Sequence, residues 1–363
     1  MDQEISTVSD VSVAVTQITD GNYVTALSTS WSPSSSRGQF YLKCAVVVIG
    51  VVATATNGLV LYALIASKQH KKHVLIVNQN ALDLFASFFL TLVYSLKLCN
   101  VYLTGSTGYW LCTLLLSESL WSCGIIGSVI NLAIVSVERY LKVVHRTWSK
   151  KYLRKWIIHS AAAFAWMASI TFNMALVLST TEVIDGACYA YAFWKNKTVL
   201  VAHTIWQFVS FYVIVLLIFI FCYWRILAVI RQQASIMAAH DTSGGSSSAP
   251  SQSNRIQTSV IKTMIFVGVL YAVTWLPHNV FVLSVALGPS NRLPDSGYYA
   301  SVVIAFLYVG INPFIYATKF DPVKEILLRM IPCKTISQQA TGNVAAAGTG
   351  TNTAQGRNTP FTR

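Results

Sequence analysis

Charged side chains interrupt stretches of this sequence that are otherwise mostly apolar. Asp83 lies in the run NQNALD, and Glu138 and Arg139 directly follow the stretch 111–137. A charged group at the centre of a bilayer costs about 2.5–3.5 kcal/mol or more, and such residues normally face a bundle interior and have a function there. We therefore expect Asp83 and Arg139 to point into the interior of a helix bundle and to carry polar chemistry there.

The residue types in these stretches do not favour catalysis or structural metal binding. Glu118 and Asp83 are 35 residues apart and lack the paired carboxylate or histidine cluster that an intramembrane enzyme needs. The seven cysteines form no CxxC pair and no Cys/His cluster with zinc spacing. A secondary transporter normally contains repeated halves, and this sequence shows no internal repeat. We expect no enzymatic activity and no organic cofactor.

Long apolar segments position these polar residues. The chain has 363 residues, of which 54% are hydrophobic and only 11% charged, whereas soluble domains are about 25% charged. About 20 residues of helix cross the roughly 30 Å hydrocarbon layer. Segments of about this length occupy residues 44–66, 74–99, 111–137, 156–179, 199–224, 263–287 and 298–318. The sequence predicts an all-α fold, a seven-transmembrane helix bundle in the lipid bilayer.

The basic residues predict the orientation of the bundle. The net charge is +13, and 20 of the 26 Lys and Arg residues lie in the segments on the same side as the C-terminus. Cytoplasmic loops retain Lys and Arg, so we expect a cytoplasmic C-terminus and an extracellular N-terminus. Because the basic residues do not gather on one soluble face, no nucleic-acid partner is expected.

The two ends of the chain differ from the bundle in composition. Residues 1–39 are polar and show no cleavable signal peptide, and we expect a disordered extracellular tail. After the last span, residues 321–331 have the pattern of an amphipathic helix on the inner leaflet, followed by Cys333, a candidate for palmitoylation. Residues 334–363 have the low complexity of a disordered cytoplasmic tail whose Ser and Thr residues are available to kinases.

Six short motifs occur in order, each in a different apolar segment. They are Asn57-Gly58, Asn78 with Asp83, Glu138-Arg139-Tyr140, Trp166, Thr274-Trp275-Leu276-Pro277 and Asn312-Pro313-Phe314-Ile315-Tyr316. In this combination the chain resembles the rhodopsin-like (class A) G-protein-coupled receptors over residues 40–333. The resemblance implies a plasma-membrane receptor whose partners are an extracellular ligand, a heterotrimeric G protein, arrestin and receptor kinases. A non-signalling decoy receptor and a membrane transporter are the alternatives.

The resemblance assigns roles to the polar residues inside the spans. It implies a water-filled pocket that can hold an allosteric sodium ion, formed by Asn57, Asp83, Ser128 and Asn312. A structural polar cluster without sodium remains the alternative, because Tyr308 and Val309 stand where the family usually has small polar ligands.

The resemblance also implies an activation switch near the cytoplasmic side. Glu138 would restrain Arg139 in the resting state, and Tyr140 completes this motif. Pro277 and Pro313 remove backbone hydrogen bonds and kink their helices, and Trp275 would report ligand contact to the first kink. In the active state, Tyr223 and Tyr316 would meet near Arg139. Val215 and Tyr271 depart from the usual proline and phenylalanine, and Gln257 replaces the usual acidic partner of Arg139.

A disulfide between Cys112 and Cys188 is the next implication of the resemblance, with Cys99 as a rival partner. Cys112 precedes Arg139 by 27 residues, two more than the family usually has. Two residues turn a helix by about 200°, so either a bulge absorbs them or Cys112 lies on a non-helical turn. Asn196-Lys197-Thr198 in the same loop is a glycosylation acceptor.

The ligand is predicted mainly by exclusion. Trp121 stands where amine receptors carry an aspartate, and Phe306 stands where light receptors carry the retinal lysine. The candidate ligand-binding residues are Glu118, Trp121, Gln207, Trp275, His278 and Phe306. We expect Glu118 to remain solvated and able to receive a basic group such as the arginine of a peptide, which favours a peptide ligand. A carboxylate at the level of the lipid headgroups without ligand contact is the alternative role for Glu118. A non-aminergic small molecule is the alternative.

Overall fold

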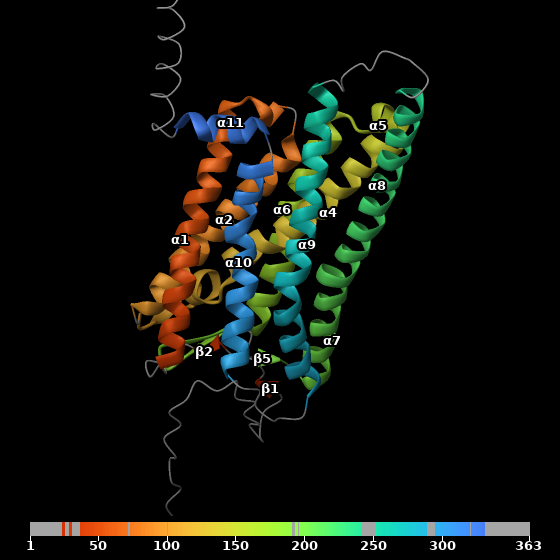
Figure 1. The fold of residues 1–363 in the computed structure, drawn as a ribbon. Coiled ribbons are helices and arrows are strands. Elements are labelled where there is room, and N and C mark those ends of the chain that lie inside the picture. Colours follow the sequence, from red (N-terminus) through yellow and green to blue (C-terminus); the bar gives the residue numbers. More distant parts are fainter. Residues whose placement is uncertain are drawn as a thin grey trace, which may run out of the picture.

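The computed structural model of the protein is a bundle of long helices (Figure 1). It describes residues 24–25, 29–30, 37–71, 73–99, 101–190, 193–194, 196–241, 252–288, 295–319 and 321–330. In this part of the chain, seven helical segments are long and apolar enough to cross a membrane. They contain α1 (Arg37–Ala66), α2 (Val74–Leu98), α3 (Gly105–Leu111) with η2 (Cys112–Leu116) and α4 (Ser119–Val144), α6 (Lys155–Thr180), α7 (Lys197–Phe208) with η3 (Val209–Val213) and α8 (Ile214–Asp241), α9 (Gln252–Leu287) and α10 (Asp295–Lys319). The predicted all-α fold class and the seven spans are confirmed.

Short elements lie at both ends of the bundle (Figure 1). One end, which we call the Arg139 end, carries η1 (Gln69–Lys71), α5 (Arg146–Tyr152) and α11 (Asp321–Met330). The opposite end, which we call the disulfide end, carries the strands β1 (Val24–Thr25), β2 (Thr29–Ser30), β3 (Glu182–Ile184), β4 (Ala187–Ala190) and β5 (Phe193–Trp194). β1 pairs with β5, and β4 lies between β2 and β3 in an antiparallel sheet.

The prediction of a disordered tail over residues 1–39 needs correction at three places. Helix α1 begins at Arg37, and the dipeptides of β1 and β2 pair with strands that follow α6. These strands offer backbone N–H and C=O groups at an open edge, which an extended polar segment can complete without burying apolar side chains. Composition alone does not predict such pairing. The rest of residues 1–36, the predicted tail 334–363 and Cys333 lie outside the described residues.

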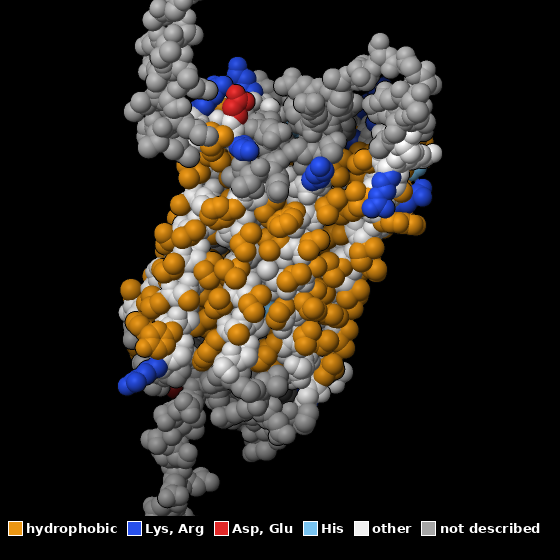
Figure 2. Space-filling model, viewed as in Figure 1, with side chains coloured by type: hydrophobic (Ala, Val, Ile, Leu, Met, Phe, Trp, Pro, Cys, Tyr) orange, Lys and Arg blue, Asp and Glu red, His pale blue; other side chains and the backbone are white. Residues whose placement is uncertain are grey.

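A belt of apolar side chains surrounds the middle of the bundle. Phe164, Leu217 and Val273 are 60%, 59% and 64% exposed, respectively. Figure 2 shows hydrophobic side chains over the central part of the visible face, with most of the visible Lys and Arg side chains toward the Arg139 end. Lipid tails are as apolar as these side chains, so the belt is the surface that a bilayer covers.

The predicted amphipathic helix is α11. Val323 on its apolar face is completely buried in the main core cluster, and Ile326 and Leu327 pack against this cluster. On the opposite face, Arg329 donates a hydrogen bond of 2.7 Å to Glu325 one turn earlier. The apolar face of α11 therefore packs against the helix bundle.

Helix α4 is the central helix of the bundle. In its span, 61% of the most apolar window is buried, compared with 22–50% in the other six spans. Small residues allow this central position: a Cβ atom added at Gly124 would lie 2.8 Å from Cβ and 2.9 Å from Cα of Ala86 in α2. The two backbones are therefore close enough that only glycine fits at residue 124.

We expect Gly124→Ala to destabilise the bundle by about 1–3 kcal/mol, the usual cost of overpacking a close contact. The added methyl group would meet backbone atoms of α2, which cannot move aside alone. Gly58→Ala is the matched control, since a Cβ at Gly58 has nothing within 4 Å and alanine is the better helix former. Thermal unfolding in detergent would measure both variants. Equal melting temperatures for the two variants would contradict the close contact.

A π-helical turn absorbs the two extra residues before Arg139. η2 is a π-helix, in which Ser117 N–H donates to Cys112 O at 2.7 Å, and Glu118 follows with a left-handed φ of 67°. The predicted bulge is thus present, and Cys112 stays inside a helix. A second π-helix, η3, precedes Val215. The fifth span therefore contains an irregular turn without the usual proline.

Candidate functional site

The side chain of Arg139 is buried and held by two neighbours. Its Nε lies 3.2 Å from Oε2 of Glu138, and its Nη2 lies 3.3 Å from Nδ1 of His73, just before α2. The side chains of Arg139 and Glu138 are 4% and 7% exposed. Lys142 Nζ lies 2.5 Å from the other carboxylate oxygen of Glu138. One carboxylate therefore pairs with two cations, of which only Lys142 has a partly exposed side chain.

Two of the predicted switch tyrosines lie near this pair. Tyr223 is buried, and its hydroxyl group lies 2.9 Å from Ser136 Oγ. Tyr140 is directed differently: its hydroxyl group contacts His145 Nε2 at 3.0 Å, and its ring packs against Phe221. The side chains of Tyr316 and Gln257 lie outside the described residues. The structure thus brings Tyr223, but not Tyr140, into the buried polar layer below Arg139.

Asp83 lies at the centre of a buried polar cluster. Its Oδ1 accepts hydrogen bonds from Ser128 Oγ at 2.6 Å and from Gln79 Nε2 at 3.5 Å. Its Oδ2 accepts one from Asn312 Nδ2 at 3.2 Å. Asn57 does not bond to Asp83: its amide donates to the carbonyl groups of Ala53 and Val309. Of the four predicted residues, three are therefore joined directly and Asn57 belongs to the wall.

The cluster continues into a chain of side-chain hydrogen bonds that crosses the bundle. Trp166 Nε1 donates to Asn78, Asn78 donates to Asn131, and Asn131 donates to Gln79 Oε1, at 2.8–2.9 Å. Gln79 Nε2 in turn hydrogen-bonds to Ser128 Oγ. Sequence reasoning missed Gln79 and Asn131. Gln79 precedes Asp83 by one helical turn, and this i, i+4 spacing is the signal that could have found it.

The donor set is of the type that a hard cation such as sodium accepts. Carboxylate, hydroxyl and amide oxygens surround the cluster. Two fully buried amide oxygens, Asn57 Oδ1 and Asn312 Oδ1, have no hydrogen-bond partner, and a cation could satisfy them. However, the amide group of Gln79 donates toward Asp83 Oδ1 and Ser128. The residues fit the ion chemically, and Gln79 competes with it for the carboxylate.

Closer to the disulfide end, α9 is joined to the irregular fifth span. Pro277 lies inside α9, and Pro313 lies inside α10. Below Pro277, the hydroxyl group of Tyr271 donates to Phe211 O in η3, and Tyr212 donates to Ala272 O at 2.8 Å. The hydroxyl group of Tyr271, which the usual phenylalanine lacks, therefore joins α9 to η3 by a hydrogen bond.

A cavity of about 240 Å³ opens between the helices toward the disulfide end. Five of the six predicted ligand residues line it: Glu118, Trp121, Gln207, Trp275 and His278. Phe306 does not line the cavity, and the prediction needs correction there. Its ring packs edge-on against Trp121, with centroids 4.9 Å apart, and is almost completely buried. Phe306 therefore supports Trp121 from behind.

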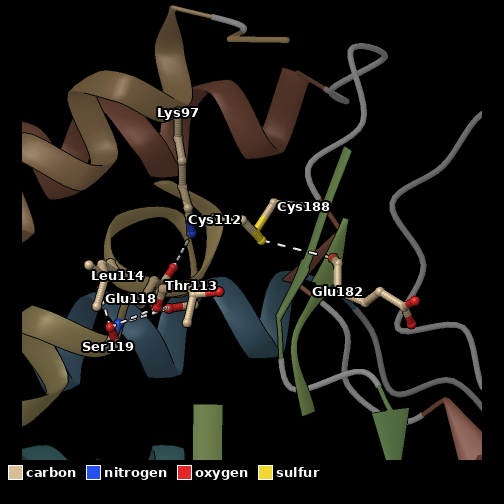
Figure 3. Close-up of a disulfide and its surroundings, with 9 residues drawn as sticks. Lys97, Cys112, Thr113, Leu114, Glu118, Ser119, Glu182 and Cys188 are labelled. Carbon is tan, nitrogen blue, oxygen red and sulfur yellow. Dashed lines mark hydrogen bonds and ion pairs between the residues drawn. A yellow bond between two sulfur atoms is a disulfide. The ribbon is translucent and has the colours of Figure 1, made fainter. Parts of the chain in front are cut away.

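Glu118 also differs from the prediction. It was expected to be solvated, but its side chain is only 14% exposed, and its carboxylate pairs with Lys97 of α2, whose side chain is 8% exposed (Figure 3). The backbone of Glu118 is left-handed and follows the π-helix, so its side chain points in a direction that ordinary helical spacing does not predict.

Sequence reasoning missed several aromatic and polar residues of this cavity. His203 of α7 lines it, and its ring lies near those of Phe172 and Trp194. His203 precedes Gln207 by four residues, so the two share a helix face. Asn279 and Tyr298 also line the cavity. The helical spacing from Gln207 was a usable signal for His203.

The predicted disulfide Cys112–Cys188 is present and lies next to the Lys97–Glu118 pair (Figure 3). It joins β4 to the first residue of η2. Cys99, the rival partner, is a free and exposed cysteine. Asn196, the predicted glycosylation residue, is exposed, and its Oδ1 caps α7 by accepting from Val199 N–H at 2.8 Å.

We expect loss of the disulfide, in Cys112→Ala/Cys188→Ala, to reduce stability by about 2–5 kcal/mol. The bond closes a separation of 76 residues and anchors the strands over the cavity. Cys99→Ala is the control and should leave the melting temperature unchanged, because Cys99 is exposed and unpaired. Thermal unfolding under non-reducing conditions measures both. If the double variant were as stable as the wild type, the disulfide would not contribute to the stability of the protein.

Comparison with known proteins finds a matching family profile and several similar receptors. The profile of the family described as "7 transmembrane receptor (rhodopsin family)" matches residues 56–316. Galanin receptor type 1 of Rattus norvegicus is 24% identical over 314 residues, which cover 82% of this chain and 84% of that receptor. Melatonin receptor type 1A of Phodopus sungorus is 26% identical over 278 residues, 73% of each chain. Melanopsin of Felis catus is 21% identical over 324 residues, which cover 85% of this chain and 65% of that protein.

Proposed function

This chain belongs to the rhodopsin family of seven-transmembrane receptors, and we propose that it transmits the binding of an extracellular ligand to nucleotide exchange on a heterotrimeric G protein. It is a multi-pass plasma-membrane receptor and not an enzyme. The observation that carries the proposal is the separation of two sites: a cavity lined by aromatic residues near the disulfide end, and a restrained, buried arginine near the other end.

We propose that the disulfide end faces outward and the Arg139 end faces the cytoplasm. Disulfides form and persist in oxidising compartments, and Cys112–Cys188 lies at the first end. The Arg139 end holds the basic residues of α5, including Lys150 and Lys151, as expected for cytoplasmic loops. Glycosylation at Asn196 is consistent with the same orientation and is part of the proposal.

The contacts of α9 support a route between the two sites. Trp275 and His278 line the cavity on either side of Pro277, where the helix lacks a backbone hydrogen bond. A ligand that moves Trp275 therefore acts at the weakest point of α9. One turn below, Tyr271 hydrogen-bonds across to η3. A change in the bend at Pro277 would strain the hydrogen bond between Tyr271 and Phe211 and would displace the end of α9 that lies nearer Arg139.

At the Arg139 end, the pairing of Arg139 with Glu138 supports a resting state. The guanidinium group is buried and directed to groups of α4 and the residue before α2, so it is not free to contact another protein. Movement of α9 would open space for Arg139 to leave Glu138, since shifts of packed helices between two arrangements are a common form of switching. We propose Arg139 and the exposed residues of α5, all of its residues except Ser149, as part of the coupling surface.

The ligand itself belongs to the proposal. The galanin and melatonin receptors are named for different ligands, so the relatives leave the ligand class open. The case for a basic peptide depended on an available carboxylate at Glu118, and Lys97 already neutralises that group. The cavity therefore favours the alternative, a non-aminergic small molecule, and a peptide becomes the second candidate.

Coexpression with a panel of G proteins tests the proposal. Ligand libraries of both classes are added, and nucleotide exchange is measured for the wild type and for Arg139→Ala at equal surface expression. Exchange that depends on Arg139 supports the receptor function. Absence of exchange with every G protein, despite saturable ligand binding, would instead support a non-signalling decoy receptor.

Regulation and lipid attachment complete the proposal. We propose that receptor kinases phosphorylate the Ser and Thr residues of segment 334–363 and that arrestin then binds it, because each phosphate adds about 1.5–2 negative charges. Palmitoylation of Cys333 would add a second anchor beside α11. Both sites lie outside the described residues, so these proposals depend on the sequence and the family alone.

A further inference from the structure

The cavity contains buried polar atoms that no protein group satisfies. Four of them belong to lining residues: Nε1 of Trp121, Nε1 of Trp275, Nε2 of His203 and Nδ1 of His278. An indole N–H can only donate, and a neutral imidazole nitrogen donates or accepts according to its tautomer. Buried polar groups are normally hydrogen-bonded. A ligand in the cavity could therefore satisfy the indole N–H groups of Trp121 and Trp275 if it offers hydrogen-bond acceptors.

The cavity carries no uncompensated charge. Among the described residues that line it, Glu118 is the only acidic or basic side chain apart from the two histidines. Its carboxylate is paired with Lys97, which approaches from α2 outside the lining. A cationic ligand would have to compete with Lys97 for the carboxylate of Glu118, and breaking a buried ion pair is costly. An anionic ligand would be repelled by the carboxylate of Glu118, because Glu118 lines the cavity and Lys97 does not.

The fold holds Lys97 and Glu118 in place. Glu118 N–H donates to Leu115 O at 2.9 Å at the end of the π-helix. The first residue of this π-helix, Cys112, is fixed by the disulfide to Cys188 (Figure 3). Lys97 lies in the last turn of α2, and its ammonium group is 5.1 Å from the centroid of the Tyr94 ring. Lys97 therefore lies within α2 and Glu118 directly before α4, with Glu118 in the cavity lining and Lys97 outside it.

We infer that the cavity selects a compact, uncharged aromatic ligand with hydrogen-bond acceptors, and that Lys97 is the residue that enforces the absence of charge. The inference rests on the proposed function, in which this cavity is the ligand site. Its volume of about 240 Å³ is below the roughly 300–1,000 Å³ of pockets for drug-sized ligands, which supports a small ligand. The lining rings of Trp121, Trp275 and Phe172 supply the aromatic contacts.

Three matched probes test this selection directly. Phenethylamine is cationic, 3-phenylpropanoate is anionic, and N-phenethylacetamide is neutral with a carbonyl acceptor, while all three carry the same ring. Each is added to purified wild-type receptor in detergent over the same millimolar range, and the melting temperature is recorded. We expect stabilisation by the acetamide, with an apparent Kd lower by about tenfold or more than those of the two charged probes.

Charge-removal variants identify Lys97 as the selecting residue. In Lys97→Met the carboxylate of Glu118 loses its partner, and phenethylamine should become the best stabiliser. In Glu118→Gln no carboxylate faces the cavity, and 3-phenylpropanoate should bind more tightly than it does to the wild type. The double variant Lys97→Met/Glu118→Gln removes both charges and should again prefer the acetamide. Because it removes both charges of the Lys97–Glu118 pair, it provides a folded protein for comparison where a single variant fails to fold.

Each result decides the inference. Equal or stronger stabilisation of the wild type by the amine, as expected for a basic peptide group, would overturn it. So would the absence of any shift with all three probes, or an unchanged preference in both single variants. No G protein takes part in these measurements, so they are independent of the exchange assay with Arg139→Ala, which tests the signalling function separately.

Discussion

Arg139→Ala is expected to abolish both basal and ligand-stimulated nucleotide exchange, a loss of about tenfold or more. The side chain is the only buried cation of the polar layer at its end of the described bundle, and it is held in place by Glu138 and His73. Alanine removes the group that we propose to reach the G protein, while α4 keeps its helix because alanine is a strong helix former. The measurement is exchange in membranes at matched surface expression.

Glu138→Gln is the companion variant and should raise basal exchange. The substitution keeps the shape of the side chain and removes the charge that pairs with Arg139 at 3.2 Å. Breaking one partner of a buried pair is costly, and here the cost falls on the resting state. Basal exchange several times that of the wild type is expected, about 1 kcal/mol in the resting equilibrium.

Two controls separate this lock from charge effects in general. Lys142→Gln removes the partly exposed cation that shares the Glu138 carboxylate but leaves the pair with Arg139. Arg329→Gln breaks an exposed pair on α11, and exposed pairs contribute little. Both should show basal exchange close to the wild type. If Lys142→Gln raised exchange as much as Glu138→Gln, the restraint would depend on local charge instead of the Arg139 pair.

Features determined by local sequence were predictable. The seven spans follow from apolar length. Pro277 and Pro313 lie inside helices of the expected spans, and the disulfide partners follow from the family resemblance. The two extra residues after Cys112 also predicted an irregularity, because whole turns of a helix cannot absorb them, and η2 is that irregularity.

Features that depend on side-chain direction after an irregular turn were not predictable. Ordinary helical spacing placed Glu118 above Trp121 and toward water, whereas the left-handed residue after η2 directs it to Lys97. Lys97 itself comes from another helix, and sequence spacing says nothing about such pairs. The prediction for Phe306 was wrong for a related reason. Phe306 lies at the level of the cavity along α10, but its ring packs against Trp121, and it is Trp121 that lines the cavity. Height along a span is encoded locally, and the order of side chains across the bundle is not.

Asp83→Asn is expected to abolish any sodium dependence of stability and to change basal exchange in the same protein. A cation that binds the resting state stabilises it in proportion to RT ln(1 + [Na]/Kd). Asparagine keeps the shape but offers an N–H₂ group where Asp83 now accepts from Ser128, Gln79 and Asn312. One donor would then face another donor, which costs about 1–3 kcal/mol.

The amide group of Gln79 makes a second, opposite prediction possible. It donates toward Asp83 Oδ1 and Ser128 and therefore occupies lone pairs that an ion would need, so the sodium effect in the wild type should be small. Gln79→Leu removes this competitor and should enlarge the difference in melting temperature between sodium and choline chloride at equal ionic strength. The control is Gln79→Leu/Asp83→Asn, in which the difference should disappear. Equal sodium sensitivity in the wild type and Asp83→Asn would remove the ion from this cluster, and Asp83 would then act only by joining α2, α4 and α10 through hydrogen bonds.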